Sequence, residues 1–282
     1  MEQIHLDHES VLRILPDREI TAHKGNFGKI LLLCGSKGYT GAAALAATGA
    51  LRSVAGMVYL GVPECIYSIM AVKLTEPVVF SLCDKDGKLS ENAVAQIGEM
   101  TDKMDAVLIG SGLGQSEGTL AILRFVLETY RGPVVLDADG INLIAKHKDI
   151  LRGRTGVTIL TPHEGEFQRL GYKLSGDRVL DAVTAAEDLG SIIVLKGHRT
   201  VITDGITCYV NLTGNPGMAV GGSGDVLAGI IVSLLGQRLT PLEAAACGVR
   251  LHGAAGDLCA EKIGQYGMLP SDMLSALPQL MK

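Results

Sequence analysis

Short apolar runs alternate along the chain with longer stretches in which apolar residues recur at helical spacing. The runs contain few polar positions, so they predict strands covered on both faces by the helices between them, as in a parallel sheet. The predicted strands lie within residues 29–35, 57–63, 76–83, 105–114, 132–140, 157–167 and 191–197. The predicted helices span residues 41–56, about 90–100, 117–130, 178–189, 224–236, 241–262 and 270–281.

The pattern changes after Lys196. The segment RTVITDGITCYVN carries an Asp204-Gly205 pair between two runs of β-prone residues, which predicts a hairpin. We therefore expect an α/β fold with a mainly parallel central sheet, an antiparallel hairpin at one edge and a mainly helical C-terminal part. No linker, low-complexity tract or internal repeat interrupts residues 1–282, so we expect a single domain.

Composition and charge limit the kinds of molecule that the protein is expected to bind. The 282 residues are 47% hydrophobic and 20% charged, which suits a globular protein with a large core. A net charge of −5, no basic tract and only 4% aromatic residues speak against nucleic acid as a partner. The polar start MEQIHLDHES is unlike a secretory signal, and the longest apolar helix is too short to span a membrane. Six cysteines without a CxxC pair favour buried free thiols and a cytoplasmic location.

Polar and glycine residues gather where the predicted strands end. In an open parallel sheet, ligands bind beyond the carboxyl ends of the strands. These ends carry Gly35-Ser36, the segment GSGLG at 110–114, Asp137-Ala138-Asp139, Thr161-Pro162-His163 and Lys196-Gly197-His198. We therefore expect residues that are far apart in the chain to converge on one rim of the sheet.

The stretch TGNPGMAVGGSGDVLAGI, residues 213–230, runs from a glycine-rich turn directly into a predicted helix. Glycines let backbone N–H groups approach an anion, and the helix N-terminus adds a favourable dipole. Asp225 in the first turn would stay ionised and could accept a proton from a substrate hydroxyl. The alternative is a plain turn in which Asp225 only caps the helix. The stretch is neither a Walker phosphate loop nor a convincing dinucleotide fingerprint.

The other charged residues at the strand ends each allow two interpretations. Glu166 in TPHEGEF either holds Mg²⁺ through water or favours a helix N-terminus. Alternation puts Asp137 and Asp139 on the same side, where they suit a cation or a hydroxyl, although they could equally cap the next helix. Lys196 either pairs with a phosphate or extends from the sheet edge into solvent.

Elsewhere the polar residues offer weaker candidates. No pattern of a hydrolase triad or a zinc site stands out. We expect His252 to be a packed or hydrogen-bonded helix residue, and Arg250 and Asp257 to lie on a solvated helix face.

Six motifs occur in order between about residue 23 and about residue 257. They are HKGNFGKILLLCGSKGYTGAAALAATGALRSVAG, IGSGLG, DADGIN, LTPHEGEF, VLKG and GNPGMAVGGSGDVLAG. Together they closely resemble the NAD(P)H-hydrate dehydratase family, a branch of the ribokinase-like superfamily, in its bacterial single-domain form. The resemblance implies a ribokinase-like three-layer α/β/α fold. It also implies repair of the S form of hydrated NADH and NADPH, by phosphorylation of the ring hydroxyl with ADP and loss of phosphate, giving AMP.

The resemblance assigns roles to the matching residues. Asp225 would activate the hydroxyl, and Gly222 and Gly224 would form the anion hole for the moving phosphoryl group. Glu166 matches the acid linked to Mg²⁺. The positions that match substrate contacts are Ala42 or Ala43, Gly112, His163 and Asp225. The positions that match nucleotide contacts are Lys196, Gly197, His198, Arg199, Thr200 and Gly224.

Four positions depart from the family's pattern without removing a predicted catalytic group. Glu164 and Ser111 stand where Pro is usual, and Ser223 and Val220 stand where Thr is usual; Glu164 predicts a less rigid loop. The resemblance further implies a homo-oligomer, as a tetramer, and a hydrate epimerase that would be a separate protein. A kinase of a vitamin-precursor alcohol is the alternative function, because the glycine loop would serve both reactions. A non-catalytic nucleotide-binding protein is a third.

Overall fold

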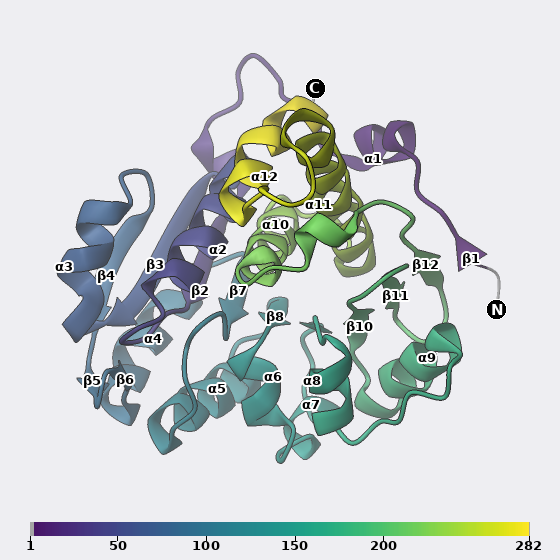
Figure 1. The fold of residues 1–282 in the computed structure, drawn as a ribbon. Helices are drawn as coiled ribbons and strands as arrows, with labels where there is room; N and C mark the ends of the chain where they lie inside the picture. The colour runs from purple at the N-terminus through teal and green to yellow at the C-terminus, as the bar shows by residue number, and fades with distance from the viewer. Residues whose placement is uncertain (1–2, 282) are drawn as a thin grey trace.

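The computed structural model describes residues 3–281, in which one large sheet runs through the molecule (Figure 1). The sheet has ten strands in the order β1-β12-β11-β10-β9-β8-β7-β2-β3-β4. Its neighbours are parallel except at β10–β11 and β11–β12, which are antiparallel. The strands are β1 (Gln3–Ile4), β2 (Lys29–Leu33), β3 (Met57–Pro63), β4 (Val78–Leu82), β7 (Ala106–Ile109), β8 (Val134–Leu136), β9 (Thr158–Leu160), β10 (Ile192–Leu195), β11 (Val201–Thr203) and β12 (Cys208–Val210). A separate ribbon pairs β5 (Asp84–Lys85) with β6 (Lys88–Leu89).

Helices cover both faces of the sheet, which confirms the predicted three-layer α/β/α arrangement (Figure 1). On one face lie α2 (Thr40–Arg52), α3 (Glu64–Lys73), α10 (Ser223–Gly236), α11 (Pro241–Ile263) and α12 (Pro270–Ala276), with α1 (His8–Ile14) against α11. On the other lie α4 (Val94–Thr101), α5 (Glu117–Thr129), α6 (Asp139–Ile144), α7 (Asp149–Arg152), α8 (Glu164–Arg169) and α9 (Arg178–Leu189). Short 3-10 turns occupy Lys24–Phe27, Glu91–Ala93, Pro216–Met218 and Leu277–Leu280.

The alternation of side chains along each strand divides the core in two. In β2, Ile30 and Leu32 face the layer of α2 and α10, whereas Leu31 and Leu33 face the layer of α5. All four side chains are fully buried. Each such burial stabilises the fold by about 1.5–3 kcal/mol, which explains why these strands carry no polar alternation.

Helix α10 packs directly against α2 near the middle of one layer. Residues 226–236 of α10 are all buried. A Cβ at Gly229 would lie 2.1 Å from the Ala46 carbonyl oxygen, so only glycine allows this approach. The close packing fixes the direction of α10 and holds its N-terminus at the carboxyl ends of the strands.

The predicted hairpin is confirmed at β11 and β12. Asp204 Oδ1 closes its turn by accepting hydrogen bonds from the backbone N–H groups of Ile206 at 2.9 Å and Thr207 at 2.7 Å. The hairpin is not the outermost element, however, because β1 adds to β12 in parallel.

All six cysteines are free; four are buried as predicted, but Cys65 and Cys83 are exposed. Between residues 3 and 281, no helix has the length and apolar character required to cross a membrane.

Candidate active site

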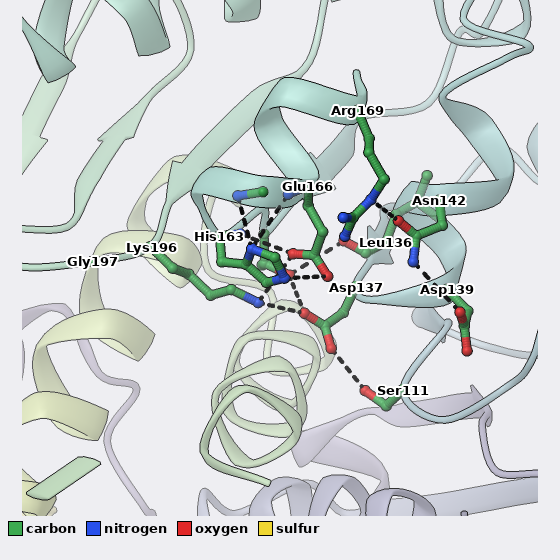
Figure 2. Close-up of polar contacts among 12 residues, drawn as sticks. Ser111, Leu136, Asp137, Asp139, Asn142, His163, Glu166, Arg169, Lys196 and Gly197 are labelled. Carbon is green, nitrogen blue, oxygen red and sulfur yellow. Dashed lines mark hydrogen bonds and ion pairs between the residues drawn. The ribbon is translucent and has the colours of Figure 1, made fainter. Parts of the chain in front are cut away.

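The carboxyl ends of β7, β8, β9 and β10 bring a cluster of polar side chains to one rim of the sheet (Figure 2). Asp137, directly after β8, lies at its centre and is only 2% exposed. Asp137 Oδ1 accepts hydrogen bonds from Thr161 Oγ1 at 2.6 Å and Lys196 Nζ at 3.0 Å. Its Oδ2 accepts one from Ser111 Oγ at 3.0 Å. The buried carboxylate therefore has partners on both oxygens, as a charge removed from water requires.

Lys196 points inward from the end of β10. Its Nζ lies 3.0 Å from Asp137 Oδ1 and 3.7 Å from Glu166 Oε2, and its side chain is 19% exposed. Burial by itself lowers the pKa of Lys196, but the carboxylates of Asp137 and Glu166 outweigh burial and raise it. A Cβ on Gly224 would lie 3.4 Å from Nζ, so the ammonium group sits beside the start of α10. Lys196 is thus a fixed cation of the rim and does not extend into solvent.

His163 and Glu166 form a reciprocal cap at the start of α8. His163 Nδ1 accepts hydrogen bonds from the backbone N–H groups of Gly165 at 3.0 Å and Glu166 at 3.3 Å. Glu166 Oε2 accepts one from the His163 backbone N–H at 2.8 Å. This pattern puts the imidazole proton on Nε2, which lies 3.4 Å from Glu166 Oε1. Of the two interpretations of Glu166, the structure therefore shows the one in which its side chain caps the start of α8.

Asp225 lies in the first turn of α10 and has an unusual protonation equilibrium. Burial, and then the negative charge of Asp137, raise its pKa from 3.8 to about 7. The Ser111 hydroxyl and the Lys196 cation act in the opposite direction and lower it, and Glu166 adds a smaller increase. The helix dipole favours an ionised acid by only about 0.3–2 kcal/mol, whereas this shift corresponds to about 4 kcal/mol. Burial and the charge of Asp137 thus outweigh the effect of the helix dipole, on which the expectation of an ionised Asp225 rested.

The N-terminus of α10 is built from residues that leave it accessible. Gly222 occupies the N-cap position with φ +102°, and among residues 3–281 no side chain accepts a hydrogen bond from this helix start. A Cβ at Gly222 would lie 2.5 Å from Leu45 Cδ1, a side-chain end that can shift, so it is the backbone conformation that favours glycine here. Ser223 Oγ lies 3.3 Å from Nε2 of the buried His252. Burial lowers the pKa of His252 to about 4, so it is a neutral packed residue, as predicted.

On α11, Asp257 holds the glycine-rich loop and Arg250 holds the N-terminal segment. Asp257 accepts hydrogen bonds from the Gly214 backbone N–H at 2.9 Å and from Asn215 Nδ2 at 3.0 Å. Arg250 Nε donates to the Leu6 carbonyl oxygen at 3.1 Å, which ties the N-terminal segment to α11. The expectation of a solvated helix face is therefore wrong for both residues. No local pattern signals these contacts, because the partners lie far apart in the sequence.

Asp137 and Asp139 serve different loops. Ala138 between them has φ +48° and ψ −110°, which breaks the alternation of an extended strand. Asp139 Oδ2 accepts a hydrogen bond from the Gly114 backbone N–H at 2.8 Å, away from Lys196. The prediction that both carboxylates face the same side is wrong, because it assumed an extended backbone at Ala138.

Two of the positions matched to substrate contacts lie side by side. A Cβ at Gly112 would lie 2.7 Å from the Ala42 Cβ, so the loop after β7 touches the start of α2. Ala42 is half-buried, whereas Ala43 is fully buried and faces Gly35. Of the two alanines, Ala42 is therefore the one that a ligand can reach.

The segment that follows Lys196 is a tight turn. Thr200 Oγ1 donates to the Gly197 carbonyl oxygen at 3.0 Å and accepts from the Gly197 backbone N–H at 3.3 Å. Its hydroxyl is thus used inside the turn, while His198 and Arg199 are exposed. A cavity of about 520 Å³ adjoins the turn, with Arg178 and Arg199 among its lining residues.

Glu164 is tied down by an ion pair. Arg178 Nη1 pairs with Glu164 Oε1, and Arg178 Nη2 donates to the carbonyl oxygens of Leu195 at 3.1 Å and Lys196 at 3.0 Å. The Glu164–Arg178 pair therefore links α8 to the end of β10, at the position where a proline would restrict the backbone. This ion pair restrains α8 through a contact with α9, so the local sequence around Glu164 does not reveal it.

Known proteins share both this sequence and this fold. Residues 30–279 match the family model described as NAD(P)H-hydrate dehydratase. The bifunctional NAD(P)H-hydrate repair enzyme Nnr of Moorella thermoacetica is 43% identical over 275 residues, which cover 95% of this chain and 52% of that protein. The ADP-dependent (S)-NAD(P)H-hydrate dehydratase of Listeria monocytogenes is 32% identical over 95% of this chain and 92% of its own length.

A solved relative has the same architecture. The crystal structure of the ADP/ATP-dependent NAD(P)H-hydrate dehydratase from Bacillus subtilis, co-crystallized with ATP/Mg²⁺, superposes with a TM-score of 0.84. The two chains are 33% identical, and the match covers 97% of this chain and 96% of that one. This chain spans about half the length of the first curated relatives that it matches.

Proposed function

The chain belongs to the NAD(P)H-hydrate dehydratase family, and on this basis we propose that it dehydrates the S form of hydrated NADH and NADPH. ADP is the proposed phosphoryl donor. Asp225 takes the proton of the ring hydroxyl while the hydroxyl oxygen attacks the β-phosphorus, and AMP leaves. The lone pair of the ring nitrogen then expels phosphate from C6, a proton leaves C5, and the C5–C6 double bond is restored.

The observation that carries this proposal is the environment of Asp225. A base works best when the pKa of its conjugate acid lies near the operating pH, and the pKa of Asp225 is raised to about 7. The carboxyl group also sits in the first turn of a helix whose N-terminus has no side-chain cap among the described residues, an arrangement that favours an anion. A proton acceptor and an anion site thus occur together, which is what phosphorylation of a hydroxyl requires.

The nucleotide would bind along the same rim. Lys196 supplies a cation that Asp137 holds in place, and Gly222 and Gly224 leave the backbone open to phosphate oxygens. Gly197, His198, Arg199 and Thr200 form the adjoining turn, and the cavity beside it gives room for the rest of a nucleotide. The substrate ring would lie near Ala42, Gly112, His163 and Asp225.

Mg²⁺ is proposed as the companion of the nucleotide. Within residues 3–281 no group of three His, Cys, Asp or Glu side chains is arranged to hold a metal ion, and Glu166 already caps α8. The residues therefore fit a cation held mainly by phosphate oxygens and water, with Glu166 reached through water, and do not fit a cage made by protein alone. When bound, the cation would offset the negative charge of the phosphates.

Further proposals concern the organisation of the protein. We propose that residues 1–282 form a single domain, that the enzyme is cytoplasmic, and that an epimerase activity interconverts the two hydrate forms. We also propose a homo-oligomer, as a tetramer. Its support is an apolar face on α3, where Ile69 is 52% and Val72 is 89% exposed, beside the edge strand β4. Light scattering after size-exclusion chromatography measures this directly, and a monomer at all concentrations would contradict it.

The test is a repair assay with each donor nucleotide. Hydrated NADH is incubated with the protein and ADP or ATP, and recovery of the near-ultraviolet absorbance of the reduced ring is followed together with AMP and phosphate release. Asp225→Asn should still bind ADP but lose about 10²–10⁴-fold in kcat. Asp102→Asn, on an exposed helix end, is the matched control and should behave as wild type. Absence of recovery with either donor contradicts the proposal, and a stable phosphorylated product would favour the kinase alternative.

A further inference from the structure

A chain of hydrogen bonds at the rim orients one exposed arginine. Arg169, the last residue of α8, donates from Nε to Asn142 Oδ1 at 2.7 Å. Asn142 Nδ2 donates in turn to Asp139 Oδ1 at 3.5 Å, and Asp139 Oδ2 accepts from the Gly114 backbone N–H at 2.8 Å. The chain of hydrogen bonds thus links the guanidinium on α8 to α6, as Figure 2 shows, and through Asp139 to the loop after β7. An exposed arginine held this way has less side-chain freedom to lose when it binds a ligand.

The charge of Arg169 has no carboxylate partner. Arg152 and Arg178 are paired with Asp188 and Glu164, whereas other exposed arginines of the described residues, such as Arg52 and Arg199, lack an acidic partner as Arg169 does. Across residues 3–281, no acidic oxygen lies within the 4.0 Å of an ion pair with Arg169. Its Nε is occupied by Asn142, so the two Nη groups form the free edge of the guanidinium. Such an edge matches two oxygens of one phosphate group.

Arg169 lies beside His163, which matches a substrate-contact position. A Cβ at Gly165 would lie 3.0 Å from His163 Cε1 and 3.6 Å from Arg169 Nη1, so the two side chains flank the same glycine. In the view of Figure 2, Lys196 and Arg169 project into the rim from opposite sides of Glu166. The rim therefore carries two separate cationic groups.

We propose that Arg169 binds a phosphate group of the hydrated dinucleotide, and that Asn142 and Asp139 position its guanidinium for this contact. The inference rests on the proposed function and names a substrate subsite for it. Lys196 beside α10 serves the donor nucleotide, so the second cation is left for the dinucleotide. That substrate carries a pyrophosphate bridge, and its NADPH form carries a 2′-phosphate as well.

Arg169→Ala tests the subsite through KM and kcat. Loss of a charge-assisted hydrogen bond should raise KM for at least one of the two hydrated dinucleotides about 10- to 100-fold, with kcat within about threefold and the Kd of ADP unchanged. Hydrated NADH and hydrated NADPH are affected alike if the bridge is bound, whereas only the NADPH form is affected if the 2′-phosphate is bound. Arg124→Ala on α5 removes the same charge from an exposed site and should leave KM unchanged.

The positioning role is tested with a double-mutant cycle. Asn142→Ala should raise KM by a smaller factor than Arg169→Ala, and the double variant should be no worse than Arg169→Ala alone. If the factors by which the two single substitutions raise KM multiply in the double variant, the positioning role is overturned. If the KM of Arg169→Ala stays within twofold of wild type for both substrates, the subsite is overturned.

Binding of intact NADH and NADPH, followed by their fluorescence, gives a readout that does not depend on turnover. Arg169→Ala should raise the Kd of at least one of them about 10-fold or more. An unchanged Kd for both would refute the subsite, whereas wild-type protein that binds them without repairing hydrates would refute only the proposed reaction.

Discussion

Replacing Asp225 with asparagine should stabilise the folded protein at alkaline pH while it removes activity. The raised pKa of about 7 means that the folded state holds the Asp225 proton more tightly than the unfolded state, whose pKa is near 3.8. Folding therefore loses stability as pH rises from about 4 through about 7, because ionisation is costlier in the folded site. The difference of about three pKa units corresponds to about 4 kcal/mol at pH above 7.

The assay is denaturant unfolding of wild type and Asp225→Asn at about pH 4.5 and about pH 8. The variant should be close to wild type at the lower pH and more stable by up to about 4 kcal/mol at the higher one, with an unchanged m-value. Asp102→Asn is the control, because the exposed Asp102 lacks a buried charge and should show no such pH dependence. An equal gain at both pH values, or no gain at pH 8, would refute the argument that a buried charge raises the pKa.

Three further predictions concern the surroundings of this carboxylate and its helix. Asp137→Asn removes a charge that raises the pKa of Asp225, so the acidic limb of the kcat/KM profile should move to lower pH. Ser111→Ala removes a hydroxyl that lowers this pKa, so the acidic limb should move to higher pH. Lys196→Ala should raise the Kd of ADP about 10- to 100-fold with a smaller effect on the hydrated substrate; titration calorimetry measures both, and equal losses would contradict its assignment to the nucleotide. Gly229→Ala places a Cβ against the α2 backbone and should cost at least about 1–3 kcal/mol in urea unfolding, whereas an unchanged midpoint would show that the helices can separate.

The fold was predictable where local signals agree with each other. The helix expected at 178–189 has those bounds in the structure, because Asp177 caps its start and Gly190 ends it in a left-handed conformation with φ 58°. Helix α3 was missed, since ECIYSIMAVK has apolar residues on both faces and shows no helical stripe. The short strand β1 was missed for a different reason: it exists only because the edge of β12 lies beside it.

The chemistry of the rim was predictable, but the pairing within it was not. Lys196 stands out because it directly follows an apolar strand, and Glu166 and Asp225 stand out because they lie in the first turns of helices that follow a strand end and a glycine-rich loop. Which of them touch depends on the order of strands, and Asp137 meets Lys196 because β8 and β10 flank β9. The positive φ of Ala138, which separates Asp137 from Asp139, comes from tertiary contacts and not from its own residue type.

The strength of Asp225 as a base and its cost to stability have the same origin. Three carboxylates, Asp137, Glu166 and Asp225, share the surroundings of one ammonium group, Lys196, and burial together with the charges of Asp137 and Glu166 raises the pKa of Asp225 to about 7. A conjugate acid that is weaker by about three units makes the carboxylate about a thousandfold better at holding a hydroxyl proton, and about 4 kcal/mol of folding stability is lost at alkaline pH for that gain. A variant that relieves the buried charge, such as Asp137→Asn, should therefore become more stable above neutral pH and a weaker base at the same time. A variant that keeps the base strength of Asp225 without the loss of folding stability would have to raise its pKa by a means other than burial beside Asp137.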